Sequence, residues 1–213
     1  MQIEHVKPEE IEKRSFEIIS QELAEMGKVI PEDKAHIIKR CIHTTADFDY
    51  ADTMYFSESA LERLEELILQ GAGIVTDTNM ALTGINKKAL AEFGIDARCF
   101  MADENIAKLA KERGVTRATV SMQQAAKSGQ ELIFVIGNAP TALISLREMY
   151  DSNEYKPAFV IGVPVGFVNV VAGKELIIDT DIPCIINRGR KGGSNVAAAI
   201  VNAVLYRLRE KNK

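Results

Sequence analysis

Five short apolar segments in the second part of the chain constrain the fold more than any other feature. They are rich in β-branched residues, nearly continuous rather than alternating, and mostly followed by helix-like sequence. In order they are GIVTD (73–77), RCFM (98–101), ELIFVIG (131–137), AFVIGVP (158–164) and PCIINRG (183–189). Buried strands of a parallel sheet have this pattern, because helices cover both of their faces. We therefore predict an α/β protein with three layers, α/β/α, around a mostly parallel sheet.

The first third of the chain predicts long helices packed onto this sheet. Pro8 suits the first turn of one helix, and Gly27 suits its end. Pro31 is expected to open a second helix. Ser57 is expected to cap a third, which Gly71 would end.

Composition and charge exclude several classes of protein. The net charge is −4, so the chain lacks the overall positive charge of nucleic-acid-binding proteins. Three scattered cysteines without CxxC spacing fit a reducing cytoplasm better than a disulfide framework or a zinc site. The charged N-terminus does not resemble a secretory signal, and the longest uncharged run is too short for a membrane span. We expect one soluble, cytoplasmic domain over residues 1–213, without nucleic-acid or membrane partners.

The carboxyl ends of the predicted strands are the expected ligand site, because open parallel sheets bind ligands there. The first strand leads into a polar loop that includes Thr83 and Gly84, with Asp77 as an alternative turn former. The third leads into NAPTAL, where Ala139 offers no side-chain cap before Pro140. Unless Asn138 caps this turn, its N–H groups stay available for an anion.

The last two strand ends add glycines and cations. Backbone around VPVGF (163–167) could approach a flat ligand closely, or could pack tightly against a helix. In RGRKGGS (188–194), arginines and glycines precede a helix that Ser194 can cap, which suits a carboxylate or phosphate. An ordinary glycine-rich turn with solvated charges is the alternative. The order is neither that of a P-loop nor GxGxxG.

One edge of the second predicted helix carries His36, Arg40 and His43, which are four and three residues apart. A lone histidine is more often structural than catalytic. His43 differs because it ends the helix and precedes TTADFDY (44–50), whose hydroxyls and carboxylates could orient its ring. No metal-binding histidine spacing and no GxSxG elbow occur.

Seven motifs together resemble the precorrin-8X methylmutases, called cobalt-precorrin-8 methylmutases in the anaerobic pathway. The resemblance covers nearly the whole chain, in the expected order, through KRSFEII (13–19), RCIH (40–43), IVTDTNM (74–80), VTRA (115–118), IGNAPTAL (136–143), IGVPVGFV (161–168) and NRGRKGGS (187–194). It implies an isomerase of corrin biosynthesis that moves a methyl group between macrocycle carbons eleven and twelve. Precorrin-8 or cobalt-precorrin-8 would yield hydrogenobyrinate or cobyrinate. No cofactor or metal is implied, and the family is similar in forming homodimers with a cleft near the subunit interface.

The resemblance also implies roles for individual residues. His43 resembles the family's proton donor and acceptor, Ser15 and Arg40 match substrate-binding positions, and Arg117 is a further candidate. Strand-end position adds weaker substrate-binding candidates: Thr83, Gly84, Asn138, Ala139, Thr141, Arg188 and Gly193. His36 lies outside the matched motif and is expected to be structural.

Two alternative functions compete with this interpretation. A nucleotide- or phosphate-binding enzyme could be built on the RGRKGGS loop. A non-catalytic tetrapyrrole carrier would bind the macrocycle without needing His43.

Overall fold

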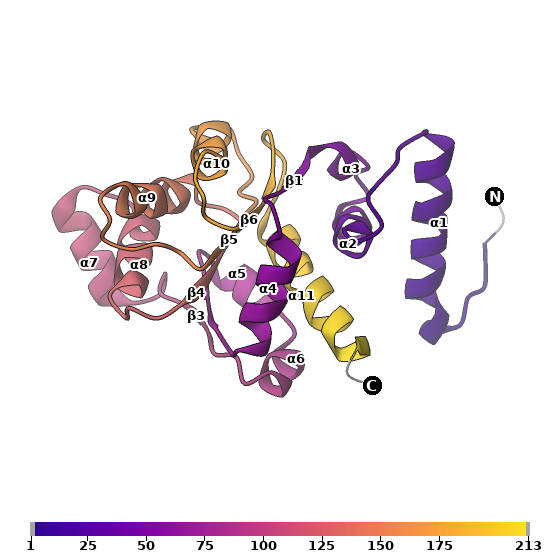
Figure 1. Ribbon diagram of the computed structural model, residues 1–213, viewed down its shortest axis with the longest axis horizontal. Coiled ribbons are helices and arrows are strands. Elements are labelled where there is room, and N and C mark those ends of the chain that lie inside the picture. Colours follow the sequence, from indigo (N-terminus) through magenta and orange to yellow (C-terminus); the bar gives the residue numbers. More distant parts are fainter. Residues whose placement is uncertain (1–2, 212–213) are drawn as a thin grey trace.

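The computed structural model describes residues 3–211, and a six-stranded sheet lies at its centre (Figure 1). The strand order is β1-β6-β5-β4-β2-β3, with β1 antiparallel to β6 and the other neighbours parallel. The strands are β1 (Met54–Phe56), β2 (Gly73–Thr76), β3 (Ala97–Cys99), β4 (Leu132–Ile136), β5 (Phe159–Gly162) and β6 (Cys184–Asn187). The predicted mostly parallel α/β fold is confirmed. Four of the five predicted segments contain a strand, and the remaining one, 98–101, overlaps β3 by two residues.

Eleven α-helices and one 3-10 turn surround the sheet within the described residues. They are η1 (Pro8–Glu10), α1 (Ile11–Glu25), α2 (Ala35–Thr45), α3 (Tyr50–Thr53), α4 (Ala60–Leu69), α5 (Asn79–Gly84), α6 (Lys87–Glu92), α7 (Glu104–Arg113), α8 (Arg117–Ala126), α9 (Pro140–Asp151), α10 (Val170–Ile178) and α11 (Ser194–Lys211).

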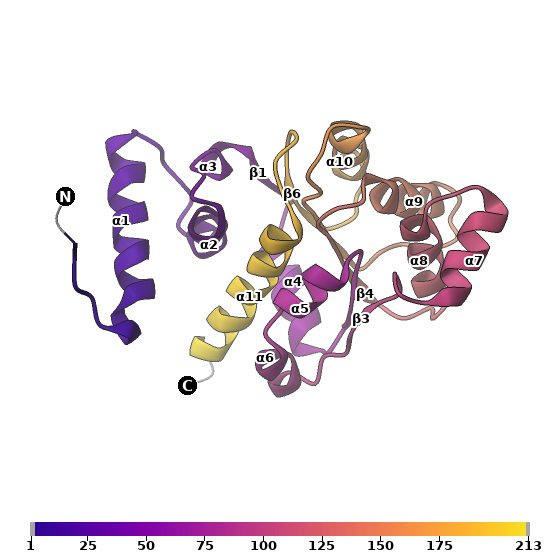
Figure 2. The same cartoon turned by 180° about the vertical axis from the view of Figure 1, so that it is seen from behind.

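The two faces of the sheet are covered by different helices. Along β4, Ile133 and Val135 join a core with α2, α4 and α11, whereas Phe134 and Ile136 join a core with α8, α9 and α10. This alternation follows from the two-residue period of a strand, and burial on both faces explains the continuous apolar runs. Helix α2 packs on α11, and α1 packs on α2 at the outside of the molecule (Figure 2).

Several predicted boundaries were wrong. Pro31 precedes α2 by several residues, since α2 begins at Ala35. Ser57 does not cap α4, because its hydroxyl accepts the Cys184 N–H (2.9 Å) and extends the β1–β6 edge. Strand β1, with the three residues MYF, was not predicted. The loop expected after β2 is instead α5, which Thr78 caps by accepting the Ala81 N–H.

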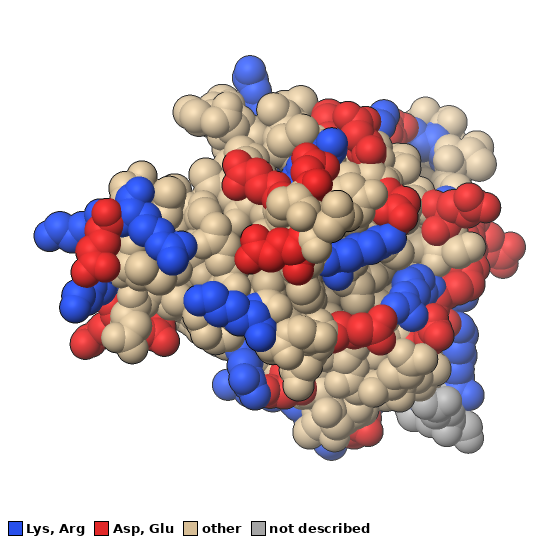
Figure 3. Space-filling view, turned by 60° about the vertical axis from the view of Figure 1, so that its left-hand side comes forward, with Lys and Arg blue, Asp and Glu red and all other residues tan. Residues whose placement is uncertain are grey.

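The surface carries a mixture of charges. On the face in Figure 3, Lys and Arg side chains are interspersed with Asp and Glu side chains.

None of the helices in residues 3–211 is long and apolar enough to cross a membrane. All three cysteines are free.

Candidate functional site

The end of α2 brings three elements together around Arg40 and His43. Four buried apolar residues fix the inner face of α2, which leaves His43 exposed and Arg40 only half-buried. Phe16 of α1 stacks on the His43 ring, with 5.4 Å between ring centroids and 28° between ring planes. The Arg40 guanidinium lies 5.3 Å from the Phe16 ring centre and 5.0 Å from that of Tyr206 on α11. Aromatic contacts from α1 and α11 therefore hold the two predicted residues in place.

Arg40 already binds a carboxylate from its own chain. Its Nη2 lies 2.7 Å from Oε1 of Glu12, which is largely exposed on α1. Both side chains line a cavity of about 450 Å³, together with Tyr206 and Asn86. Ser15 lies on the same helix as Glu12, and its hydroxyl donates to the Ile11 carbonyl (2.9 Å). Arg40 therefore borders an open cavity, with Glu12 paired to its guanidinium.

The hydroxyls and carboxylates after His43 do not bind its ring. Thr45 donates to the Cys41 carbonyl (2.8 Å), and Asp47 and Asp49 each place a carboxylate oxygen 2.6 Å from Nζ of Lys191. These carboxylates raise the pKa of Lys191, and hydrogen bonding to Lys191 lowers the pKa of Asp47. Within residues 3–211, the His43 ring takes part in no hydrogen bond or ion pair. The acidic loop thus ties the end of α2 to the loop after β6.

Asp77 occupies the turn at which a free anion cradle was expected. Its carboxylate accepts the N–H groups of Gly137 (2.9 Å), Asn138 (2.8 Å) and Ala139 (2.6 Å) at the start of α9. Asp77 is completely buried, and this burial raises its pKa despite the three donors. Asp77 therefore occupies the N–H groups of the three residues before α9. Asn138 does not cap the helix, and Asp77 binds none of the N–H groups of its first turn, so the expected anion site there stays a prediction.

Glycines allow the other strand ends to interlock. Gly193 donates its N–H to the Val163 carbonyl (2.9 Å), at a φ of 140° that favours glycine. A Cβ atom on Gly137 would lie 2.6 Å from the Ser194 Cα, so β4 touches the start of α11. The Ser194 hydroxyl in turn bonds that of Thr78 (2.8 Å). The glycine-rich motifs therefore serve close packing between the ends of β2, β4, β5 and α11.

The remaining predicted residues lie around this rim. Arg117, at the start of α8, is exposed, and the hydroxyls of Thr116 and Thr141 are 2.8 Å apart, which joins α8 to α9. Arg188 is exposed, stacks on Tyr55 and lies 3.4 Å from a Glu175 oxygen. Thr83 and Gly84 end α5 and are exposed, and the Gly84 carbonyl accepts from Asn202 of α11.

The predicted residues thus form two groups. One group, at the end of α2, contains Ser15, Arg40 and His43. The other, at the strand ends, contains Thr83, Gly84, Arg117, Asn138, Ala139, Thr141, Arg188 and Gly193. Lys191 joins the two groups through Asp47 and Asp49. Sequence reasoning missed this link, and it also missed the stacking of Phe16, which looked like a core residue.

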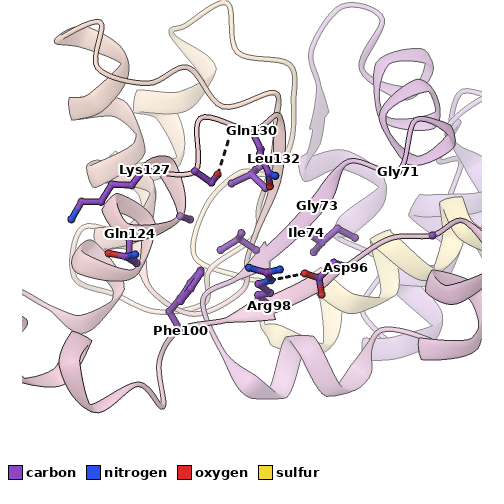
Figure 4. Close-up of a pocket in the computed structure, with 14 residues that line it drawn as sticks. Gly71, Gly73, Ile74, Asp96, Arg98, Phe100, Gln124, Lys127, Gln130 and Leu132 are labelled. Atoms are coloured by element: carbon purple, nitrogen blue, oxygen red, sulfur yellow. Dashed lines mark hydrogen bonds and ion pairs between the residues drawn. The ribbon is translucent and has the colours of Figure 1, made fainter.

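A larger cavity, of about 510 Å³, lies away from both groups (Figure 4). It is lined by the first residues of β2 and β4, Gly73 and Leu132, and by Arg98, which pairs with Asp96 (2.5 Å). None of the predicted site residues lines it.

Among residues 3–211, no three His, Cys, Asp or Glu side chains are arranged to hold a metal ion.

His36 is a structural residue in this fold, as expected. Its Nδ1 lies 3.0 Å from Nη1 of Arg207. A guanidinium is always a donor, so the imidazole accepts and is neutral. Burial, followed by the charge of Arg207, lowers the pKa of His36 to about 4.

Acid should destabilise the protein through His36. The folded-state pKa lies below the unfolded value of about 6.5, so the unfolded chain binds the proton more readily between these values. The stability that neutral His36 provides is complete above that range and is lost as pH falls from 6.5 through 4. Urea unfolding at several pH values should therefore show a smaller loss for His36→Gln than for the wild type. His5→Gln, at an exposed position, should lose as much stability on acidification as the wild type. If His36→Gln also loses as much as the wild type, His36 is not the group responsible.

Fold and site together define a three-layer α/β protein with an exposed histidine and several cationic side chains beside the carboxyl ends of a mostly parallel sheet. Comparison with known proteins narrows this class. The precorrin-8X methylmutase family model matches residues 10–207. The chain belongs to this family, whose members are isomerases of cobalamin biosynthesis that catalyse an intramolecular methyl migration.

Individual relatives agree with the family match. The chain is 46% identical over 209 residues to the cobalt-precorrin-8 methylmutase of Salmonella typhimurium. This match spans 96% of this chain and 97% of the relative. It is 36% identical over 196 residues to the precorrin-8X methylmutase of Pseudomonas aeruginosa, and that match spans 91% of this chain and 93% of the relative. The crystal structure of precorrin-8X methyl mutase from Thermus thermophilus superposes with a TM-score of 0.85 at 33% identity, over 96% of this chain and all of that one.

Proposed function

We propose that this protein moves a methyl group from carbon eleven to carbon twelve of a precorrin-8 macrocycle, with His43 as the proton donor and acceptor. The observation that carries the proposal is the end of α2, where an exposed imidazole and a guanidinium lie side by side. Family membership supplies the reaction, and this geometry supports the assignment of roles.

The substrate explains the cationic site. The macrocycle is broad and flat, and its rim carries acetate and propionate carboxylates. Arginine binds carboxylates in a bidentate manner, and Arg40, Arg117 and Arg188 come from three separate elements. A rim with several carboxylates suits such a distribution.

His43 is suited to lend and recover a proton. The methyl shift needs no redox step and no external nucleophile, but it is favoured when protonation of a ring nitrogen withdraws electrons from the macrocycle. Histidine is the side chain that best exchanges a proton near neutral pH. Phe16 stacks on the ring of His43, and the residue is exposed. The imidazole is therefore accessible to a substrate.

A labelled substrate tests the reaction directly. Precorrin-8 carrying ¹³C in the migrating methyl group, in metal-free and cobalt-loaded forms, would be incubated with the protein and followed by NMR and visible absorption. We expect the label to move from carbon eleven to carbon twelve in at least one form. Failure to convert either form would overturn the proposed function. Turnover of only one would assign the cobalt state of the substrate.

Arg40→Gln should weaken substrate binding more than it slows the chemical step. A hydrogen bond to a charged group contributes about 1.5–3 kcal/mol, so KM should rise roughly ten- to a hundredfold with little change in kcat. The substrate carboxylate would replace that of Glu12, which now occupies Arg40. Steady-state kinetics check this result. Arg14→Gln removes another arginine that pairs with acidic side chains near the start of α1 and should leave KM unchanged. An unchanged KM for Arg40→Gln would exclude Arg40 from the binding site.

We also propose that the protein is a homodimer. The outer face of α1 exposes Ile11 and Ile18, and the loop after β5 exposes Phe167 and Val168. Exposed apolar side chains that lie together can mark a subunit contact, and each of these two places offers a pair that is adjacent in the fold or in the sequence. Light scattering after size-exclusion chromatography should give twice the chain mass of 23.5 kDa. A monomer at micromolar concentration would contradict this.

A further inference from the structure

Lys174 is an unusual lysine, because its side chain is completely buried. It lies in the middle of α10, in the otherwise mostly apolar segment VVAGKELII. Lysine is among the residues least often buried in folded proteins unless it is paired. A buried ammonium is costly, so its partners indicate what it does.

Its partners are backbone carbonyls rather than carboxylates. Nζ donates to the carbonyls of Gly189 (2.8 Å) and Lys191 (2.9 Å), in the loop after β6. Among the described residues, no carboxylate forms an ion pair with Lys174. Burial lowers the pKa of Lys174 to about 8, so the ammonium form still predominates at neutral pH. A positive charge thus lies beneath the loop and holds two of its carbonyls.

The loop is fixed at the intervening residue as well. The Arg190 carbonyl accepts the Gly166 N–H (3.1 Å), and Asn187 donates a second bond to the Lys191 carbonyl (2.9 Å). Three consecutive carbonyls, at residues 189–191, are therefore hydrogen-bonded to neighbouring parts of the protein. In Figures 1 and 2 this loop rises beside α10 on one side and β1 on the other.

The side chains of the same loop carry its positive charges. The Arg190 guanidinium lies 5.3 Å from the centre of the exposed Phe167 ring, and Arg188 lies over Tyr55. Lys191 reaches Asp47 and Asp49 beyond the end of α2. The backbone of residues 188–191 thus carries all three cationic side chains, and Lys174 holds two of its carbonyls.

We propose that Lys174 is a positioning residue for substrate binding, because it holds the loop after β6 in the arrangement that presents Arg188 and Arg190 to the carboxylates of the macrocycle. The inference rests on the proposed function. Lys174 itself does not touch the substrate. It acts through the backbone of the loop, and its charge replaces the solvent that would otherwise hydrate the Gly189 and Lys191 carbonyls.

Lys174→Met tests this role, because methionine is unbranched and of similar size but offers no donor. Kinetics would be measured well below the unfolding temperature. We expect KM to rise at least about tenfold, a loss of about 1.4 kcal/mol in binding, with kcat within about threefold of the wild type. Ile177→Ala, a buried apolar substitution on the same helix, is the matched control. It should lower Tm without changing KM.

Two further measurements keep the proposal open to refutation. Hydrogen exchange of the amides in residues 188–193 should be faster in Lys174→Met than in Ile177→Ala, which tests the loop without any turnover. An unchanged KM in folded Lys174→Met would overturn the proposal. If Lys174→Met does not fold, the double variant Arg188→Gln/Arg190→Gln, which alters only exposed side chains, tests the proposal instead. A raised KM in this variant supports the proposal, and an unchanged KM overturns it. Failure of the proposed function would appear separately, as absence of turnover by the wild type.

Discussion

His43→Ala should slow methyl migration by about two to four orders of magnitude, the usual contribution of a positioned general acid or base. The loss should fall on kcat, because the residues proposed to hold the substrate carboxylates are arginines and not the imidazole. His43 is exposed at the end of α2, so its removal leaves the core intact and the free energy of unfolding nearly unchanged. Single-turnover absorption with saturating substrate measures the chemical step.

His43→Gln and His36→Gln are the matched variants for this experiment. Glutamine at position 43 retains hydrogen bonding but cannot exchange a proton near neutral pH, so it should resemble alanine. His36 contacts Arg207 rather than the site, so His36→Gln should retain the wild-type rate at pH 7. Wild-type turnover by His43→Ala would remove the histidine from the mechanism and leave the site with a binding role only.

Asp77→Ala should lower the free energy of unfolding by about 3–5 kcal/mol, because it leaves three N–H groups at the start of α9 without their acceptor. The acceptor, Asp77, is completely buried and Gly137 is buried, whereas Asn138 and Ala139 lie nearer the surface. For a chain of this length the loss corresponds to a fall in Tm of roughly 10 °C. Urea or thermal unfolding, monitored by circular dichroism, measures both quantities.

Asp103→Ala provides the comparison for Asp77. Asp103 also accepts an N–H group at a helix start, that of Asn105 in α7, but it is exposed. Its loss should cost about 1 kcal/mol, as for other N-caps. Equal effects of the two substitutions would show that water replaces Asp77 readily, and that the rim is looser than its hydrogen bonds indicate.

Most of the parallel sheet was predictable because its signal is local. Each buried parallel strand carries its own run of β-branched residues, for example LIFVI in β4. Strand β1 is a three-residue edge strand whose pairing with β6 depends on residues about 130 positions away. Helix α5 was missed because NMALTG is short and shows no helical repeat, and its first turn depends on the Thr78 cap.

The site was predictable only in part, because only some of its features leave a local signal in the sequence. The spacing of Arg40 and His43 placed them on one edge of α2, since residues three apart are neighbours on a helix. Their partners come from distant elements: Phe16 from α1, Glu12 from α1 and Tyr206 from α11. Sequence spacing holds no information about such contacts. The burial of Lys174 had one local signal, a single lysine at the centre of a mostly apolar helix.

The outer position of α1 has a consequence for how a large substrate enters. The interlocked strand ends form a stiff frame, because Asp77 and the glycines join elements that are distant in sequence. Helix α1 lies outside that frame, packs mainly on α2, and is joined to it by residues 26–34. We therefore expect the joint between α1 and α2 to be the part of the proposed site that moves most readily. A macrocycle wedged there would move one helix about a hinge and break the Glu12–Arg40 contact, while the frame that holds the strand-end arginines keeps its shape.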